Sequence, residues 1–329
     1  MMAKLPEEII IDILLRLPVT SLCRFRCVSK PWLSLISDTY FIRTHLNRNT
    51  NNQKHPHDRL IIVSHPTDFH AVDLKSFQSR HDFEALHLKF PPEQKPSDCM
   101  EIWGSCDGLL LMLDDFSNCF LVNPSTRQSR KLPKSPFSIN SSEYCCLDSF
   151  GFGYDSSNDH YKVVRISHHD YNYRVACADN IVSVYSLSTD SWRRIEDSPF
   201  DHSCYEPSPG SLLGGALHWV ARTVLGSNKS TVIASLDLAD ESFHNVPCPA
   251  EFVFWDPLEK KSKELVIQGC PDYYDAETYV ETLVSPNSSN TIKRSLQAQT
   301  EACEAKTKAD LSKAKRSKPS SSKIDCCIL

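Results

Sequence analysis

The stretch LPEEIIIDILLRLPVTSLCRFRCVSKPW, from Leu5 to Trp32, decides how the first part of this chain folds. It is dense in large apolar side chains and contains neither histidine nor glycine. Pro6 suits the first turn of a helix, and the two glutamates after it favour the positive end of the helix dipole. Apolar residues then recur at helical spacing, which predicts one broad apolar face. These residues are Ile9, Ile10, Ile13, Leu14 and Leu17.

Two further helices are predicted after this one. Pro18 ends the first helix, and Thr20 or Ser21 can cap the second. The third helix begins at Lys30-Pro31. A unit of about 40 residues rarely folds without a staple or a partner. We therefore expect residues 1–46 to form three short helices that need a second protein to cover part of their apolar surface.

Composition places the whole chain among ordinary soluble proteins. Of the 329 residues, 40% are apolar and 23% are charged, and the net charge of −5 gives no reason to expect nucleic acid as the main partner. No segment approaches the ~18 apolar residues that span a bilayer, and the first residues lack a signal-peptide pattern. We expect a protein of the cytosol, the nucleus or both. Its 14 cysteines then act mostly as small buried hydrophobic residues.

The pattern changes from Arg59 to about Pro286, where short β-rich runs alternate with turn residues. Residues 47–58 are polar and predict a linker before this region. Within it one motif recurs, which consists of a strand, a polar turn and a returning strand. The copies lie at residues 69–77, 120–132, 182–195, 232–246 and 252–267. Such repetition predicts small sheets arranged radially, as in a β-propeller.

The spacing of the repeats fits a propeller with one exception. The turns begin at Asp73, Asn123, Ser186, Asp237 and Asp256, with gaps of 50, 63, 51 and 19 residues. The first three gaps suit blades of about 40–50 residues with loops, whereas the last is too short for a four-stranded blade. Either two hairpins lie side by side here, or a blade's worth of chain is absent near Glu251 and the β domain, residues 59–290, is shortened and incomplete. Residues 291–329 lose the β pattern and predict a disordered basic tail.

The opening stretch resembles the F-box. The agreement runs in order without an insertion through Leu5-Pro6, Glu8-Ile9, Ile13-Leu14, Arg16 to Pro18, Ser21-Leu22, Arg24 to Val28 and Lys30 to Trp32. The resemblance implies three helices that dock on a Skp-type adaptor, and through it on the cullin and RING subunits of an SCF ubiquitin ligase. The alternative is that these helices pack on the β domain.

The resemblance also implies which residues bind the adaptor. They would divide between the inner core of the helices and the surface that faces the adaptor. The residues are Leu5, Pro6, Ile9, Ile13, Leu14, Leu17, Pro18, Leu22, Val28 and Trp32.

The remainder resembles the F-box-associated domain of plant F-box proteins, a group with S-locus F-box and kelch-like relatives. The matching pieces are GSCDGLL (104–110), NPST (123–126), FGFGYD (150–155), DHYKVV (159–164), VYSL (184–187) with Ser191-Trp192, GGALHW (214–219) and YVETLVSP (279–286). The family pattern includes a further segment before Phe254, with a Gly-Cys-Leu stretch and a Trp-Val-Met strand, and this chain lacks it. The resemblance and the repeat spacing thus place the shortening at the same point.

No group of residues in the sequence predicts catalysis, a metal site or a cofactor. His168-His169-Asp170 invites a metal site, but no second cluster has ligand spacing, so a solvated loop is the better interpretation. His218 flanks an apolar run and is predicted to be partly buried. The run from Ser188 to Trp192 is similar to the Asp-box turn of sialidase propellers without its glycine, and it predicts a simple hairpin turn. We therefore expect a non-enzymatic protein.

The chain ends Cys326-Cys327-Ile328-Leu329, which fits a C-a-a-X prenylation motif with Cys326 as the acceptor. Basic residues upstream would supply the second signal that stable anchoring needs. They are Lys313, Lys315, Arg316, Lys318 and Lys323. The alternative is a chance ending on a disordered tail. Peripheral membrane association is expected only if Cys326 is prenylated.

These observations lead to one main hypothesis and two alternatives. The main one is a substrate-recognition subunit of an SCF (Skp-cullin-F-box) E3 ubiquitin ligase, whose β domain binds a protein target that the sequence does not identify. The first alternative is a truncated regulatory decoy that binds the adaptor but no target. The second is a glycan-binding module that uses aromatic residues such as Tyr171 and Tyr173.

Overall fold

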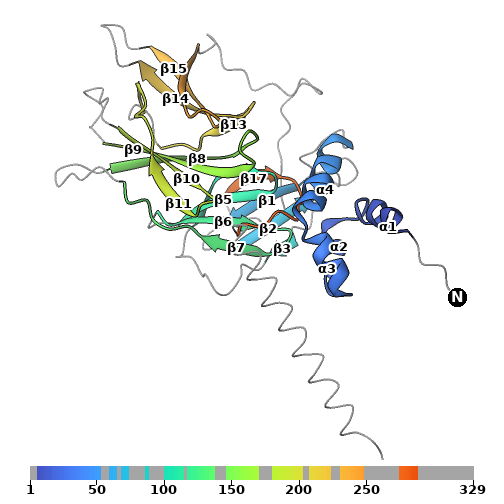
Figure 1. The fold of residues 1–329 in the computed structure, drawn as a ribbon. Helices are drawn as coiled ribbons and strands as arrows, with labels where there is room; N and C mark the ends of the chain where they lie inside the picture. Colours follow the sequence, from blue (N-terminus) through green and yellow to red (C-terminus); the bar gives the residue numbers. More distant parts are fainter. Residues whose placement is uncertain are drawn as a thin grey trace, which may run out of the picture. The chain divides into compact units, whose positions relative to one another are not determined.

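Four helices open the chain, and a series of antiparallel sheets follows them (Figure 1). The computed structural model describes residues 6–52, 59–64, 68–73, 86–88, 100–114, 117–137, 146–169, 180–202, 207–223, 230–247 and 274–287. The helices are α1 (Glu7–Leu14), α2 (Val19–Phe25), α3 (Lys30–Ile36) and α4 (Thr39–Asn52). The first and third lie where the sequence predicts them. The predicted cap of the second helix at Thr20 or Ser21 is wrong, because α2 begins at Val19 with Pro18 as its N-cap residue and has no side-chain cap. No helix within these ranges is long and apolar enough to cross a membrane.

Helix α4 is an addition to the three predicted helices, and it continues into the residues predicted as a linker. Asp38 accepts hydrogen bonds from the backbone N–H groups of Tyr40 and Phe41 at 2.9 and 3.1 Å, which satisfies donors that the start of a helix leaves unpaired. Phe41, His45 and Leu46 are buried and recur at helical spacing. The buried residues of α4 lie in its first two turns. The polar composition of residues 47–52 therefore gives no sign that they continue this helix.

The described residues of the β domain form four antiparallel sheets. Sheets B and C follow the chain order throughout, whereas β17 joins the start of sheet A and β13 lies off the main path of sheet D. Sheet A contains β1 (Arg59–Ser64), β2 (Asp68–Asp73), β3 (Leu86–Leu88) and β17 (Tyr274–Tyr279). Sheet B contains β4 (Met100–Cys106), β5 (Leu109–Asp114), β6 (Cys119–Asn123) and β7 (Gln128–Lys131). Sheet C contains β8 (Cys146–Asp155), β9 (His160–His169), β10 (Asn180–Ser186) and β11 (Ser191–Arg194). Sheet D contains β12 (Phe200–Asp201), β13 (Ser211–Leu213), β14 (Ala216–Thr223), β15 (Thr231–Asp237) and β16 (Phe243–Pro247).

Three of the predicted hairpins are confirmed. They are the pairs β6–β7, β10–β11 and β15–β16, which cover the repeats at 120–132, 182–195 and 232–246. The repeat at 69–77 includes most of β2, which pairs with β3. The repeat at 252–267 lies outside the described residues.

Four of the hairpin turns share one backbone arrangement. A residue with positive φ stands four positions after a polar residue at the end of a strand. These residues are Arg127, Asp159, Asp190 and Glu241, with φ of 56°, 55°, 54° and 61°. In the last of these turns, Asp237 accepts the N–H of Ala239 on its carboxylate at 2.7 Å and the N–H of Glu241 on its carbonyl at 3.0 Å. Local side-chain acceptors of this kind favour turns, which explains why the repeats are visible in the sequence.

The two central strands of sheet B, β5 and β6, are covered on both faces, and their sequences are almost continuous apolar runs. In β5, Leu109 and Leu111 belong to the core shared with sheet C, whereas Leu110 and Met112 belong to the core shared with sheet A. All six residues of this strand are buried. A strand enclosed in this way needs no polar face, and LLLMLD accordingly lacks the alternation of a half-exposed strand.

Sheet C is enclosed in the same manner. Phe152 and Val163 contribute to the core shared with sheet B, and Val164 and Val184 pack in a core with Trp219 of sheet D. An apolar layer thus lies between each successive pair of sheets from A to D. This arrangement confirms the β-rich, propeller-like fold that the repeats predict.

Sheet D exposes the face that is turned away from this core. Val220 and Val246 flank Ile233 across three strands, and each valine is 38% exposed. A further blade would cover such a face in a propeller. The predicted shortening near Glu251 concerns residues 248–273, which lie outside the described part of the chain, so it stays a prediction.

The two ends of the β domain meet in sheet A. Strand β17 pairs antiparallel with β1, from Arg59 opposite Tyr279 to Ser64 opposite Tyr274. Residues 280–286 follow β17 and are called the closing segment below. The sheet that begins the domain is therefore completed by its last strand.

Candidate protein-interaction sites

The opening helices share a core with a residue from the far end of the β domain. Leu22 and Ile36 are fully buried, Leu14 is 1% exposed, and Leu283 of the closing segment packs with them. At the start of α3, Ser29 accepts the N–H of Trp32 at 3.4 Å. Because of this shared core, the helices bury one side against one another and the closing segment.

The ten residues that the F-box resemblance assigns to adaptor binding fall into distinct groups. Leu14 and Leu22 lie in the helical core, Leu17 and Trp32 are half-buried, and Leu5 lies outside the described residues. The exposed members are Pro6, Ile9, Ile13, Pro18 and Val28.

The exposed members include large apolar side chains on α1 and just after α2. Ile9 and Ile13 are each 47% exposed, and Val28 is 63% exposed. The two isoleucines stand one helical turn apart and share a face. Exposed apolar side chains that gather on short helices suit a surface that a second protein covers.

The closing segment joins the helices to the sheets. Leu283 belongs to the helical core, while Val280 and Val284 belong to the core between sheets B and C. The Asn123 side-chain amide donates to the carbonyls of Thr282 and Val284 at 3.1 and 2.6 Å. This one segment therefore connects the two cores through side chains and through its backbone.

Arg43 of α4 makes a second connection to the β domain. Its guanidinium lies 3.3 Å from the Asp107 carboxylate and 3.1 Å from that of Asp159, and it stacks 4.0 Å from the ring centre of Tyr154. The Tyr161 hydroxyl donates to Asp107 at 2.8 Å. Burial raises the pKa of Tyr161, and the Asp107 charge raises it further, so this hydroxyl keeps its proton. The sequence predicts none of these contacts, although four of the five residues lie in quoted family motifs.

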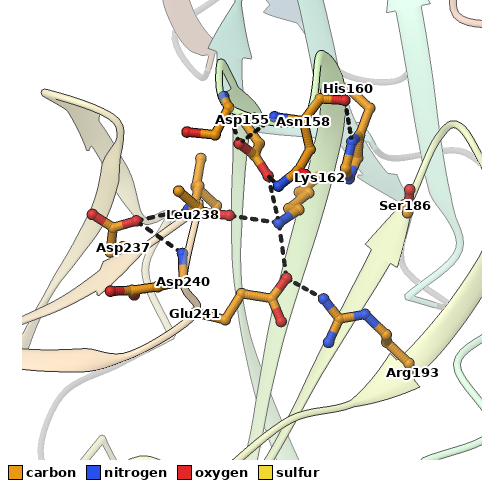
Figure 2. Close-up of polar contacts among 12 residues, drawn as sticks. Asp155, Asn158, His160, Lys162, Ser186, Arg193, Asp237, Leu238, Asp240 and Glu241 are labelled. Atoms are coloured by element: carbon orange, nitrogen blue, oxygen red, sulfur yellow. Dashed lines mark hydrogen bonds and ion pairs between the residues drawn. The ribbon is translucent and has the colours of Figure 1, made fainter.

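A buried ion-pair network connects sheets C and D (Figure 2). The Lys162 ammonium lies 2.7 Å from Asp155 and 2.8 Å from Glu241, and it donates to the carbonyl of Leu238 at 2.5 Å. The side chains of Lys162 and Asp155 are 3% and 0% exposed. Glu241 also accepts a hydrogen bond from Arg193 of β11. We call these groups the Lys162 network.

The Lys162 network lowers the pKa of both carboxylates. Burial acts to raise the pKa of Asp155, but hydrogen bonds from Lys162 and Asn158 outweigh it and lower that pKa to about 2. Burial likewise opposes ionisation of Glu241, and hydrogen bonds from Arg193 and Lys162 lower its pKa. Both groups hold protons less tightly when folded than when unfolded. They therefore contribute stability above about pH 4 that is lost as the pH falls towards 2.

Replacing Lys162 by methionine should destabilise the fold most at neutral pH. The substitution leaves two covered carboxylates without their shared cation, and breaking a buried pair costs about 3 kcal/mol of unfolding free energy. Urea unfolding followed by tryptophan fluorescence should show this loss at pH 7 and a smaller loss at pH 3.5, where carboxylates begin to bind protons. Lys134→Met, at an exposed lysine, is the control and should change little. A Lys162 variant as stable as this control at pH 7 contradicts the expectation.

The histidines differ in how well the sequence predicted their positions. His168 lies within β9 and is 1% exposed, so the predicted solvated loop is wrong at this residue. The reason is that β9 pairs with β8 as far as His169, which extends the sheet beyond its apolar part. His218 is half-buried and lies 3.2 Å from the Ser211 carbonyl and 3.1 Å from the Ser235 hydroxyl, which confirms its predicted burial.

The remaining candidate groups from the sequence are a hairpin turn, possible metal ligands, two tyrosines and a cysteine. The run from Ser188 to Trp192 forms the turn between β10 and β11 and the start of β11, as predicted. Within the residues that the structure describes, no three His, Cys, Asp or Glu side chains are grouped so that they could hold a metal ion. Tyr171, Tyr173 and Cys326 lie outside the described residues.

The fold and the two family matches define the class of protein. Four helices precede a domain of stacked β sheets, with exposed apolar side chains on α1 and just after α2, and two sets of contacts join helices and sheets. Residues 2–44 match the F-box domain, and residues 60–264 match the F-box associated beta propeller domain. The chain therefore belongs to the F-box proteins that carry this associated domain. Both family resemblances seen in the sequence are confirmed.

The chain is similar to several curated proteins of Arabidopsis thaliana. It is 34% identical to F-box protein CPR1 over 265 residues, which cover 75% of this chain and 61% of that protein. It is 30% identical to the F-box/kelch-repeat protein At3g23880 over 257 residues, which cover 74% and 65%. The chain thus spans about three fifths of the length of these relatives. Among solved structures, the N-terminal domain of Nup159 matches 57% of this chain and 45% of its own with a TM-score of 0.24 and 9% identity, which supports no conclusion.

Proposed function

We propose that this protein is a substrate-recognition subunit of an SCF ubiquitin ligase of the cytosol, the nucleus or both. The observation that carries the proposal is the exposed apolar surface of the F-box helices, where Ile9, Ile13 and Val28 are each about half exposed or more. A Skp-type adaptor would cover this surface and link the chain to cullin and RING subunits. The β domain would bind the protein target.

The proposed mechanism is proximity, with no bond chemistry performed by this chain. A bound target raises the effective concentration of its lysines near the ubiquitin that the ligase carries. The closing segment and the Arg43 contacts support this role, because they hold the helices and the sheets as one body. Contacts of this kind would help to preserve the distance between adaptor and target that transfer requires.

The decoy is the second candidate, and the exposed face of sheet D favours it. A domain that lacks part of its sheets would keep the adaptor surface and lose its target, so it would compete with complete relatives. The two candidates predict opposite effects on shared targets. A receptor shortens the lifetime of its target, whereas a decoy lengthens it.

The test is expression of the full chain with an affinity tag in plant cells, with and without a proteasome inhibitor. We expect a Skp-type adaptor and a cullin to co-purify in both samples, and ubiquitin-modified proteins to accumulate on the chain when the proteasome is blocked. Captured proteins that instead become longer-lived on expression support the decoy. A chain that recovers neither adaptor nor cullin contradicts both candidates.

A further inference from the structure

Two adjoining cavities lie beside residues 130–135, and residues from sheets B and C contribute to their linings. The larger has a volume of about 600 Å³ and the smaller about 270 Å³, and Pro133 and Lys134 line both. Cations dominate the larger cavity, namely Arg130, Lys131 and Lys134. The smaller is lined by rings, Phe150 and Trp192, and by the Asp148–Arg165 ion pair. We call the two together the basic groove.

The wall of the basic groove is held in place from sheet C. The Trp192 indole N–H donates to the carbonyl of Pro133 at 2.6 Å, and the Arg165 guanidinium donates to the carbonyl of Phe137 at 2.9 Å. These bonds fix the backbone on both sides of Lys134. A ligand would therefore meet a surface that is already ordered, which lowers the entropic cost of binding.

The charge of the basic groove is positive although the chain carries a net charge of −5. Its two acids are already paired, Asp190 with Arg130 at 2.5 Å and Asp148 with Arg165 at 2.8 Å. The side chains of Lys131 and Lys134 are exposed, and no carboxylate in the described part of the chain forms an ion pair with either. The Lys131 ammonium lies over the Phe120 ring, 5.6 Å from its centre, a contact that leaves the positive charge in place. Among the described residues, neither of these two positive charges is therefore neutralised by a carboxylate.

We propose that the basic groove binds a short, carboxylate-rich segment of the target polypeptide. Ligand carboxylates would pair with Lys131 and Lys134, while one apolar side chain would enter the smaller cavity against Phe150 and Trp192. Complementary charge at such a rim selects partners and speeds their association. This assignment deepens the proposed function, since it rests on the β domain being the part that binds the target.

The experiment is a selection of peptides on the purified full chain from a random twelve-residue display library. We expect the recovered peptides to contain at least twice the share of Asp and Glu found in the unselected library. The binding of a recovered peptide, followed by fluorescence anisotropy, should weaken at least tenfold in the Lys131→Glu, Lys134→Glu double variant. It should also weaken between 50 and 300 mM salt, because exposed charges are screened. Arg127→Glu, at an exposed position in the turn of the same β6–β7 hairpin, is the control and should bind within twofold of wild type.

Several results would overturn the groove assignment. Recovered peptides without acidic enrichment would do so, as would equal peptide binding by the double variant. A labelled single-stranded DNA octamer that binds more tightly than the peptides would assign the groove to nucleic acid instead. Adaptor capture is measured on the same preparations. A double variant that loses peptides but keeps the adaptor supports the groove, whereas a wild type that binds acidic peptides without any adaptor refutes only the ligase role.

Discussion

Replacing Ile9 and Ile13 together by aspartate is expected to abolish capture of a Skp-type adaptor while the chain stays folded. Each isoleucine is 47% exposed, and the pair lies one turn apart on α1. Removing them takes apolar area from the centre of the proposed interface, and the new carboxylates would have to lose water on binding without a partner. We expect the affinity to fall at least about a hundredfold, which corresponds to roughly 3 kcal/mol. Biolayer interferometry with purified adaptor measures this directly.

The control for this prediction is an equally drastic change at another exposed apolar residue. Leu213 of β13 is 73% exposed, so Leu213→Asp introduces the same charge away from the F-box helices. It should leave adaptor affinity unchanged within twofold. Circular dichroism and urea unfolding establish that both variants are folded. A folded Ile9, Ile13 double variant that captures adaptor as well as wild type contradicts the proposed adaptor-binding surface.

Replacing Gly108 by alanine is expected to destabilise the chain severely. Gly108 adopts φ of +77° in the turn between β4 and β5, where a side chain is strained by about 1 kcal/mol. A Cβ at this position would lie 2.1 Å from the carbonyl oxygen of Val280 and 2.4 Å from the Thr282 side chain. The closing segment would have to move, and Leu283 would move with it. We expect a loss of more than about 3 kcal/mol of unfolding free energy in urea titrations.

Gly214 offers a matched control for this substitution. It also has a positive φ, +61°, but a Cβ there would meet nothing within 4 Å. Gly214→Ala should therefore show the backbone strain alone, about 1 kcal/mol. If the two alanine variants unfold at the same urea concentration, contact between the β4–β5 turn and the closing segment does not stabilise the fold.

The sequence predicts the local elements well because their signals are local. The helices α1 to α3 follow from apolar spacing and proline positions, and the hairpins follow from turn residues such as Asn123 and Asp237. The contacts that join the parts are different in kind. Arg43 meets Asp107 and Tyr161 across 64 and 118 residues of sequence. No periodic pattern contains such a pairing, so those contacts are visible only in three dimensions.

The sequence predicts which residues belong to the candidate adaptor surface. It does not show which of them face the core of the helices and which face the adaptor. Helical spacing groups Ile9, Ile13, Leu14 and Leu22 as apolar positions without stating which of them face the core. That division depends on where the other helices and Leu283 pack. Lys162 was missed for a related reason. A lysine inside DHYKVV suggests an exposed position until the facing Glu241 of the next sheet is placed beside it.

The position of Leu283 in the helical core has a consequence for the way the chain matures during translation. The ribosome makes the F-box helices first, yet a side chain that completes their core emerges only after more than 280 residues. Sheet A likewise cannot be completed until β17 has been synthesised, because β17 pairs with β1. Contacts that are so distant in sequence form slowly and leave apolar surface uncovered meanwhile. The adaptor surface and the target domain should therefore become competent together, so that a nascent chain stalled before Leu283 has neither in final form.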